Sequence, residues 1–228
     1  MNSWIEIAQD SDFSIHNLPF GVFLRDGRGT PGVAIGDYII DLHTAAQLGQ
    51  FDDLDFDKSV FESEVLNDFI ACGKTTWSGI RRNLQEGLCD PSSILHEFKS
   101  KILVDRLSAE MRVPVRIGDY TDFYSSIEHA TNVGKMFRPD NPLLPNWKHI
   151  PVGYHGRSSS IVISGTEIKR PKGQTMPPDS DKPVYGASKR MDLELEMAYI
   201  IGKPSELGES IGAEDAEDHI FGKVIFND

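Results

Sequence analysis

The sequence predicts a fold that is mainly β with α-helices, divided near residue 115 into a small mixed region and a larger β-rich region. Short apolar and alternating segments fill residues 18–42, apolar residues at helical spacing fill 59–104, and extended segments with glycine- and proline-rich loops follow. The 228 residues are 39% hydrophobic and 25% charged, which is typical of a globular chain long enough to bury a core. We therefore expect domains at 1–115 and 116–228.

The first region begins with strand signals. Residues 20–24 form a short apolar run, and residues 33–35 and 38–40 flank Gly36-Asp37, a dipeptide suited to a tight hairpin. A capping-box pattern at 59–62 predicts the start of the helical part. The apolar stripes that predict three helices are Val65, Leu66, Phe69 and Ile70, then Trp77, Ile80, Leu84 and Leu88, then Ile94, Leu95, Phe98 and Ile102.

Gly73-Lys74-Thr75 resembles the end of a phosphate-binding loop, but that motif needs a glycine where Asp68 stands. We interpret this glycine as the end of a helix.

The second region reads as strands separated by loops. We expect extended structure at 113–117, a long loop at 138–160, strands at 160–164 and 166–170, and a second loop at 171–183, which holds four prolines. Alternation predicts a strand at 191–201, and a weak helix at 215–221 precedes an apolar strand at 224–226.

Charge and composition exclude several classes of partner. There are 35 acidic and 23 basic residues, a formal net charge of −12, which disfavours nucleic acid and anionic membranes. The sequence contains no run of about 18 apolar residues, so no membrane span is predicted. The acidic N-terminus does not fit a signal peptide. Cys72 and Cys89 lack metal-type spacing, so we expect a soluble cytoplasmic protein with reduced thiols.

The segment 191–197 carries the first candidate site. On a strand, side chains alternate between faces, so Asp192, Glu194 and Glu196 share one face with neighbours about 7 Å apart. Two carboxylates at that spacing can grip one cation. The alternative is an exposed strand with an acidic outer face.

Residues 118–138 form the second candidate. A capping-box pattern at Ser125–Glu128 predicts a short helix with His129 in its first turn, where the positive helix end favours a neutral imidazole. A neutral imidazole can accept a proton from water, as a general base must. Asp122, Tyr124 and Arg138 bracket it. The alternative is a capping cluster with a surface histidine.

The third candidate is the segment 152–160, in which glycines flank Tyr154, His155 and Arg157. Such a loop can present polar side chains to a ligand while its backbone bends tightly. The alternative is a plain connecting turn.

Together these segments resemble the fumarylacetoacetase (fumarylacetoacetate hydrolase) family. The resemblance covers most of the chain except roughly residues 45–110. Its most specific parts are IGDYTDFYSSIEHATNVGKMFR, NPLLPNWKHIPVGYHGRSSS, MDLELEMAYIIG and HIFGKVIFND.

The resemblance implies a small SH3-like N-terminal domain, followed by an incomplete β-rich fumarylacetoacetase-type catalytic domain, in a homodimer. It also implies the roles of individual residues. The metal ligands would be Asp122, Glu194, Glu196 and Asp228, the general base His129, and the substrate-binding residues Tyr124, Arg138 and Tyr154. Four carboxylates form a hard oxygen site suited to Ca²⁺ or Mg²⁺.

The expected activity is hydrolysis of the carbon–carbon bond of 4-fumarylacetoacetate to fumarate and acetoacetate, the last step of tyrosine and phenylalanine catabolism. One alternative is a related acylpyruvate hydrolase, decarboxylase or hydratase of the same superfamily. The family's catalytic domain continues beyond a segment like FND. A second alternative is therefore a truncated fragment, and we expect the 228-residue chain alone to be inactive or nearly so.

Overall fold

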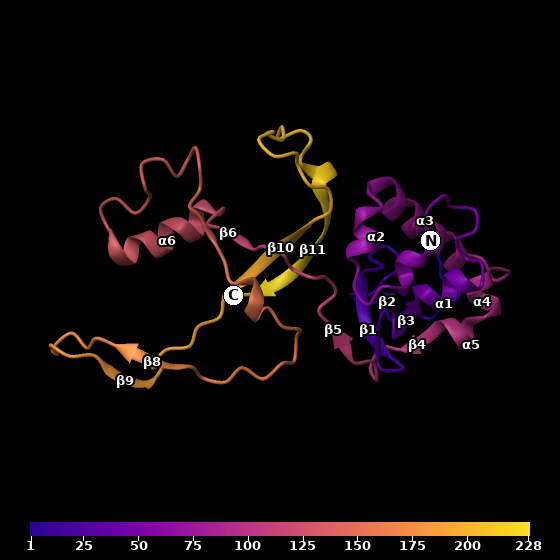
Figure 1. Cartoon of the computed structure of the whole chain (residues 1–228), viewed down its shortest axis with the longest axis horizontal. Helices are drawn as coiled ribbons and strands as arrows, with labels where there is room; N and C mark the ends of the chain where they lie inside the picture. Colours follow the sequence, from indigo (N-terminus) through magenta and orange to yellow (C-terminus); the bar gives the residue numbers. More distant parts are fainter. The chain divides into compact units, whose positions relative to one another are not determined.

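The computed structural model describes residues 1–228 and contains two compact units. The larger unit combines Met1–Val115 with Ile163–Asp228, and the smaller unit is Arg116–Val162. The architecture is mixed α/β, and every sheet is antiparallel (Figure 1). The expected domain boundary between 115 and 116 stays a prediction.

A five-stranded sheet in the order β4-β3-β2-β1-β5 organises the first part of the larger unit. The hairpin predicted at Gly36-Asp37 is confirmed: Ile35 pairs with Tyr38, and Gly36 has the positive φ of 54° that this tight turn requires. The strands are β1 (Phe20–Arg25), β2 (Arg28–Ile35), β3 (Tyr38–Asp41), β4 (Leu103–Asp105) and β5 (Met111–Arg112).

Helices cover this sheet, and α3 carries the second predicted stripe: Trp77, Ile80, Leu84 and Leu88 are all buried. The helical elements are α1 (Leu42–Gln47), η1 (Lys58–Glu62), α2 (Asn67–Ala71), α3 (Lys74–Cys89), α4 (Ile94–Glu97) and α5 (Lys99–Ile102).

Two helix predictions need correction. The prediction that a capping box at 59–62 starts the helical part was wrong. Asp57 caps a short 3₁₀ turn there, and α2 begins only at Asn67. The third stripe is divided at Phe98 into α4 and α5. Gly73, with φ 84°, separates α2 from α3, as its interpretation as a helix end predicted.

The hydrophobic core of the larger unit lies entirely within its first 115 residues. Every buried hydrophobic side chain falls between Ile5 and Ile102. From the later segment, Ile200 and Phe221 pack against this core.

The later segment of the larger unit forms two antiparallel ribbons. The expected strands at 160–164 and 166–170 do not form. The first ribbon instead pairs β8 (Lys172–Thr175), which lies inside the region predicted as a loop, with β9 (Val184–Ala187), which follows that region. Prolines 177, 178 and 183 all fall in the connection, so 172–175 keeps the N–H groups that a ladder needs.

The second ribbon pairs β10 (Leu195–Ile201) with β11 (Ile220–Asn227), as the alternation at 191–201 and the apolar run at 224–226 predicted. The short 3₁₀ helix η3 (Ala216–His219) precedes β11 and falls within the predicted weak helix.

The smaller unit pairs β6 (Thr121–Phe123) with β7 (Gly153–His155) and contains α6 (Ile127–Phe137) and the turn η2 (Ser158–Ser160).

The extended segment expected at 113–117 does not form a strand, because pairing stops after Arg112 in β5. None of the helices has both the length and the apolar character that a membrane crossing requires.

Candidate metal and substrate site

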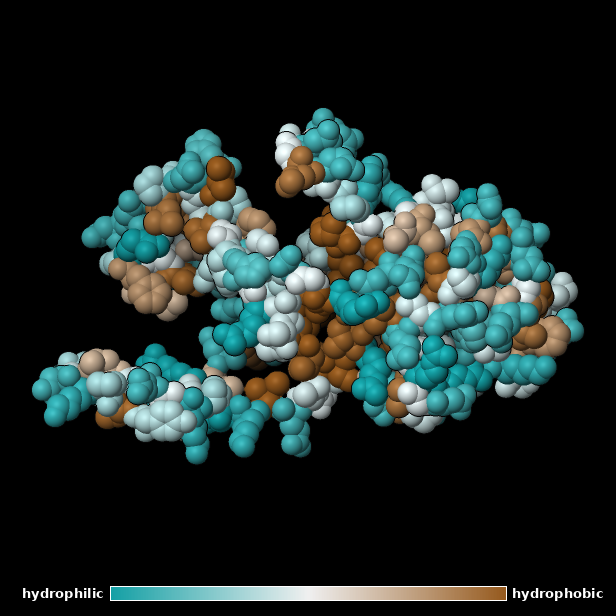
Figure 2. Space-filling model, viewed as in Figure 1, coloured by the Kyte–Doolittle hydropathy of each residue, from teal (hydrophilic) through white to brown (hydrophobic).

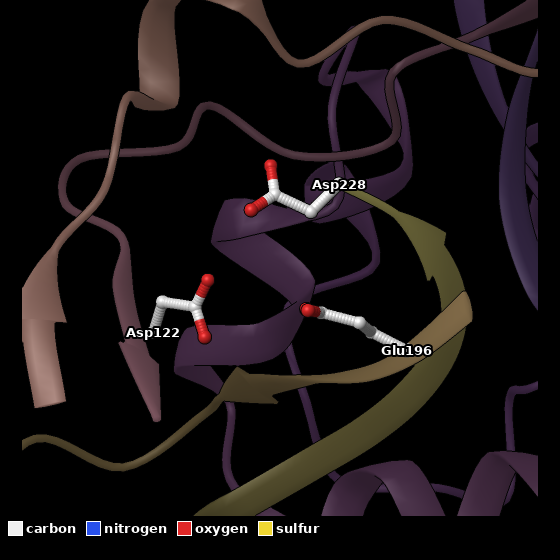
Figure 3. A group of neighbouring side chains, drawn as sticks. All are labelled: Asp122, Glu196 and Asp228. Carbon is white, nitrogen blue, oxygen red and sulfur yellow. The ribbon is translucent and has the colours of Figure 1, made fainter. Parts of the chain in front are cut away.

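The β10–β11 ribbon brings acidic side chains together on one face. Glu194 and Asp228 pair through their backbones, with N···O distances of 3.2 and 3.1 Å, and Glu196 lies two residues further along the same face. Carboxylate oxygens of Glu196 and Asp228 lie within 4.8 Å of each other (Figure 3). Glu194 shares this face but is not part of the close group.

Asp122, the third side chain labelled in Figure 3, belongs to β6 in the smaller unit. It is 8% exposed and one of only two buried charged or polar residues in the chain. Two tyrosine hydroxyls donate to the same oxygen, Oδ2: Tyr154 at 2.7 Å and Tyr120 at 3.1 Å. A buried carboxylate needs such donors, because its desolvation is otherwise costly.

His129 lies in the first turn of α6, as predicted, although the cap is shifted by one residue. Ser126, not Ser125, is the N-cap, and its hydroxyl accepts a hydrogen bond from the His129 backbone N–H at 3.2 Å. The Tyr124 ring stacks on the imidazole, with ring centroids 5.1 Å apart and planes inclined by 14°. The side chain of His129 is exposed, so its imidazole is open to a reactant.

Arg138 ends the same helix. Its backbone N–H donates to Gly134 at 2.7 Å, and its guanidinium Nη2 donates to the Pro142 carbonyl at 3.3 Å. The guanidinium is otherwise exposed and has further N–H donors for an anion. α6 therefore carries an imidazole at its start and a guanidinium at its end.

Tyr154 lies on β7 directly opposite Asp122. Its hydroxyl donates to Asp122, yet 45% of the residue is exposed, so the ring also faces solvent. Because the oxygen of a donating hydroxyl can still accept a hydrogen bond, Tyr154 can contact a carboxylate and a ligand simultaneously.

The sequence reasoning missed Tyr120. The period of two along an extended segment places residues i and i+2 on one face, so its position two residues before Asp122 was the available signal.

Comparison with known families matches residues 16–114 to the fumarylacetoacetase N-terminal family and residues 119–228 to the fumarylacetoacetate (FAA) hydrolase C-terminal family. The chain is 50% identical over 232 residues to a fumarylacetoacetase of Rattus norvegicus, a match that covers 99% of this chain and 55% of the relative. Fumarylacetoacetases of Caenorhabditis elegans and Arabidopsis thaliana are 49% and 45% identical, over 100% of this chain and 56% of each relative. The chain thus spans about half the length of the curated relatives it matches.

Proposed function

The chain belongs to the fumarylacetoacetase family, and we propose that the protein hydrolyses the carbon–carbon bond of 4-fumarylacetoacetate to give fumarate and acetoacetate. The observation that carries this proposal is about 50% identity to fumarylacetoacetases along the whole chain, including the segments that hold every candidate site residue.

We propose that Asp122, Glu194, Glu196 and Asp228 hold a divalent cation, Ca²⁺ or Mg²⁺. The donor set fits such an ion, because it consists of carboxylate oxygens and contains neither thiolate nor imidazole. The proximity of Glu196 and Asp228 supports the site, because carboxylate oxygens within 4.8 Å of each other can coordinate the same cation. When bound, the cation would polarise the substrate's carbonyl oxygens and stabilise negative charge that develops on them.

His129 is the proposed general base. Its imidazole takes a proton from water, and the resulting hydroxide adds to the carbonyl carbon beside the fumaroyl group. The bond from that carbon to the neighbouring methylene then breaks. Its electron pair leaves with the acetoacetate fragment, whose methylene carbon takes up a proton. The stacked Tyr124 ring fixes the imidazole plane for this transfer.

Arg138 and Tyr154 are the proposed substrate-binding residues, together with Tyr124. A guanidinium suits a substrate carboxylate because its planar fork can donate two parallel hydrogen bonds. Tyr154 offers its hydroxyl oxygen as an acceptor while its proton is directed at Asp122.

The finer features implied by the family remain part of this proposal: an SH3-like fold for the N-terminal domain, a homodimer, and a cytoplasmic location. The two free cysteines are compatible with a reducing compartment.

The proposed function is tested by turnover of fumarylacetoacetate. A chain extended to the length of the relatives should cleave it, whereas the 228-residue chain should be inactive or nearly so. Comparable rates for the two chains would contradict the expectation that further groups are needed. No turnover by the extended chain would overturn the proposed activity.

His129→Ala in the extended chain should abolish turnover with little loss of metal affinity, because the imidazole is proposed to move a proton and not to bind the cation. Removal of a general base typically costs about 10²–10⁴-fold in rate. His149→Ala is the matched control, an exposed histidine of the same unit with no proposed role. Near-normal turnover of His129→Ala would remove this histidine from the mechanism.

A further inference from the structure

We propose that Tyr120 is a positioning residue for the metal site: with Tyr154 it immobilises oxygen Oδ2 of Asp122, so that this aspartate offers oxygen Oδ1 to the cation. This inference rests on the proposed function, because it assumes that Asp122 is a metal ligand. It adds a residue and a single coordinating oxygen that the family resemblance did not supply.

The hydroxyls approach Asp122 from its two nearest neighbour positions on one face. Tyr120 precedes Asp122 by two residues along the chain, and Tyr154 is its direct partner across the β6–β7 ladder. Their hydroxyls lie 3.1 and 2.7 Å from Oδ2. Both bonds converge on one oxygen, which fills the lone-pair sites of Oδ2 and leaves those of Oδ1 for another partner.

The ring of Tyr120 lies against Gly156, which has no side chain to displace it. The Gly156 N–H donates to the Tyr120 carbonyl at 2.7 Å, and a Cβ added to Gly156 would lie 2.1 Å from Cδ1 of the Tyr120 ring. Only glycine permits this approach. The glycine that follows Tyr154-His155 therefore leaves room for the Tyr120 ring, whose hydroxyl donates to Asp122.

The two tyrosines have different exposures, and this separates their roles. Tyr154 is 45% exposed and is proposed to contact substrate, whereas Tyr120 is only partly exposed and its hydroxyl donates to Asp122. Outer-sphere donors to metal-ligating carboxylates orient the ligand, and their loss typically costs about 10–100-fold in metal affinity. Tyr120 should influence metal binding without influencing substrate binding once the metal is saturating.

The test is calcium affinity, measured by titrating the metal-free full-length protein with CaCl₂ in a calorimeter. Tyr120→Phe keeps the ring and removes the hydroxyl, and it should weaken Ca²⁺ binding by about 10-fold or more. At saturating Ca²⁺ the kcat and KM of this variant should return to wild-type values. Tyr154→Phe should weaken Ca²⁺ binding as well but should keep a raised KM at saturating metal. Tyr185→Phe, an exposed tyrosine of β9, is the control and should bind like wild type.

Gly156→Ala provides a second route to the same result, because the added methyl must displace the Tyr120 ring while the hydroxyl remains. It should also weaken Ca²⁺ binding. Glu196→Gln separates the two proposals. If Glu196→Gln leaves the Ca²⁺ affinity unchanged, the metal site itself is wrong. If Glu196→Gln weakens binding while Tyr120→Phe and Gly156→Ala do not, the metal site stands and the role of Tyr120 is overturned.

Discussion

The N-terminal 115 residues bury their apolar side chains, whereas the β10–β11 ribbon leaves an apolar face exposed. In the first region Leu84 is 0% exposed and belongs to a continuous core. On the ribbon, Leu195 is 79% exposed and Ile225 is 76% exposed. Figure 2 shows hydrophobic residues gathered at the surface over this ribbon. Both regions follow the sequence patterns expected of their elements, so the pattern predicts which face is apolar and not whether that face is covered.

The ribbon leaves this apolar face exposed in a chain that covers 55% of the length of its curated relatives. An exposed apolar face of this kind marks a surface that another element or a partner covers. The first region, in contrast, buries its own core within the chain.

A matched pair of leucines should show the largest difference between the regions. In this chain, Leu84→Ala should lower the free energy of unfolding by about 3 kcal/mol, because it leaves a cavity in a closed core. Leu195→Ala should change it by about 0.5 kcal/mol or less, because its side chain already contacts water. Urea unfolding followed by circular dichroism measures both. Equal losses would mean that the ribbon face is packed in solution.

A smaller effect is expected where the two regions meet within the larger unit. The register of β10 against β11 shifts between Ile200 and Ile201, leaving Phe221 as an extra residue in β11. Its ring packs edge-on against Trp77, with centroids 5.0 Å apart, and against Phe69 at 5.9 Å. The bulge thus directs an aromatic side chain of the ribbon into the N-terminal core.

Phe221→Ala should lower the free energy of unfolding by about 2 kcal/mol, less than a fully buried phenylalanine because the ring is only half-buried. The fluorescence of Trp77 should change as well, because its aromatic neighbour is removed. Ile225→Ala, on the exposed face of the same strand, is the control and should change neither property. An unchanged Trp77 signal in Phe221→Ala would contradict this contact.

The smallest expected effect is that of the ion pair between Lys74 at the start of α3 and Asp218 in η3, with Nζ and Oδ1 2.6 Å apart. The hydrogen bond from Lys74 lowers the pKa of Asp218, and the hydrogen bond to Asp218 raises the pKa of Lys74. The carboxylate's contribution is present above its unfolded-state pKa and is lost as pH falls through the lowered folded value. The ammonium's contribution is present below its unfolded-state pKa and is lost as pH rises through the raised folded value.

Asp218→Asn should therefore destabilise the chain slightly at neutral pH and have no effect at strongly acidic or strongly alkaline pH. Both groups are exposed, so the effect is small and should shrink further in high salt. The measurement is the urea midpoint of both chains across pH. A difference that persists at strongly acidic pH would show that the substitution acts through something other than this pair.

Local patterns were sufficient for several elements and for the composition of the site. The stripe of α3, the hairpin at Gly36-Asp37 and the alternation of β10 each depend on a period or a turn that a short segment expresses by itself. The period of two placed Glu194 and Glu196 on one face, and the capping-box pattern placed His129 in the first turn of a helix. The roles of these residues came from the family resemblance.

Contacts that depend on pairing between distant segments were determined only by the tertiary structure. The proximity of Asp228 to Glu196 needs the register of β10 against β11, and the hydrogen bond from Tyr154 to Asp122 needs the register of β6 against β7. The strand at Lys172–Thr175 forms because Val184–Ala187 pairs with it, whereas 160–170 finds no such partner. Backbone hydrogen bonds across a ladder stabilise a strand from outside its own sequence. A single segment can therefore indicate which face it would bury, but the chain that lies beside it determines whether the strand forms and which side chains it meets.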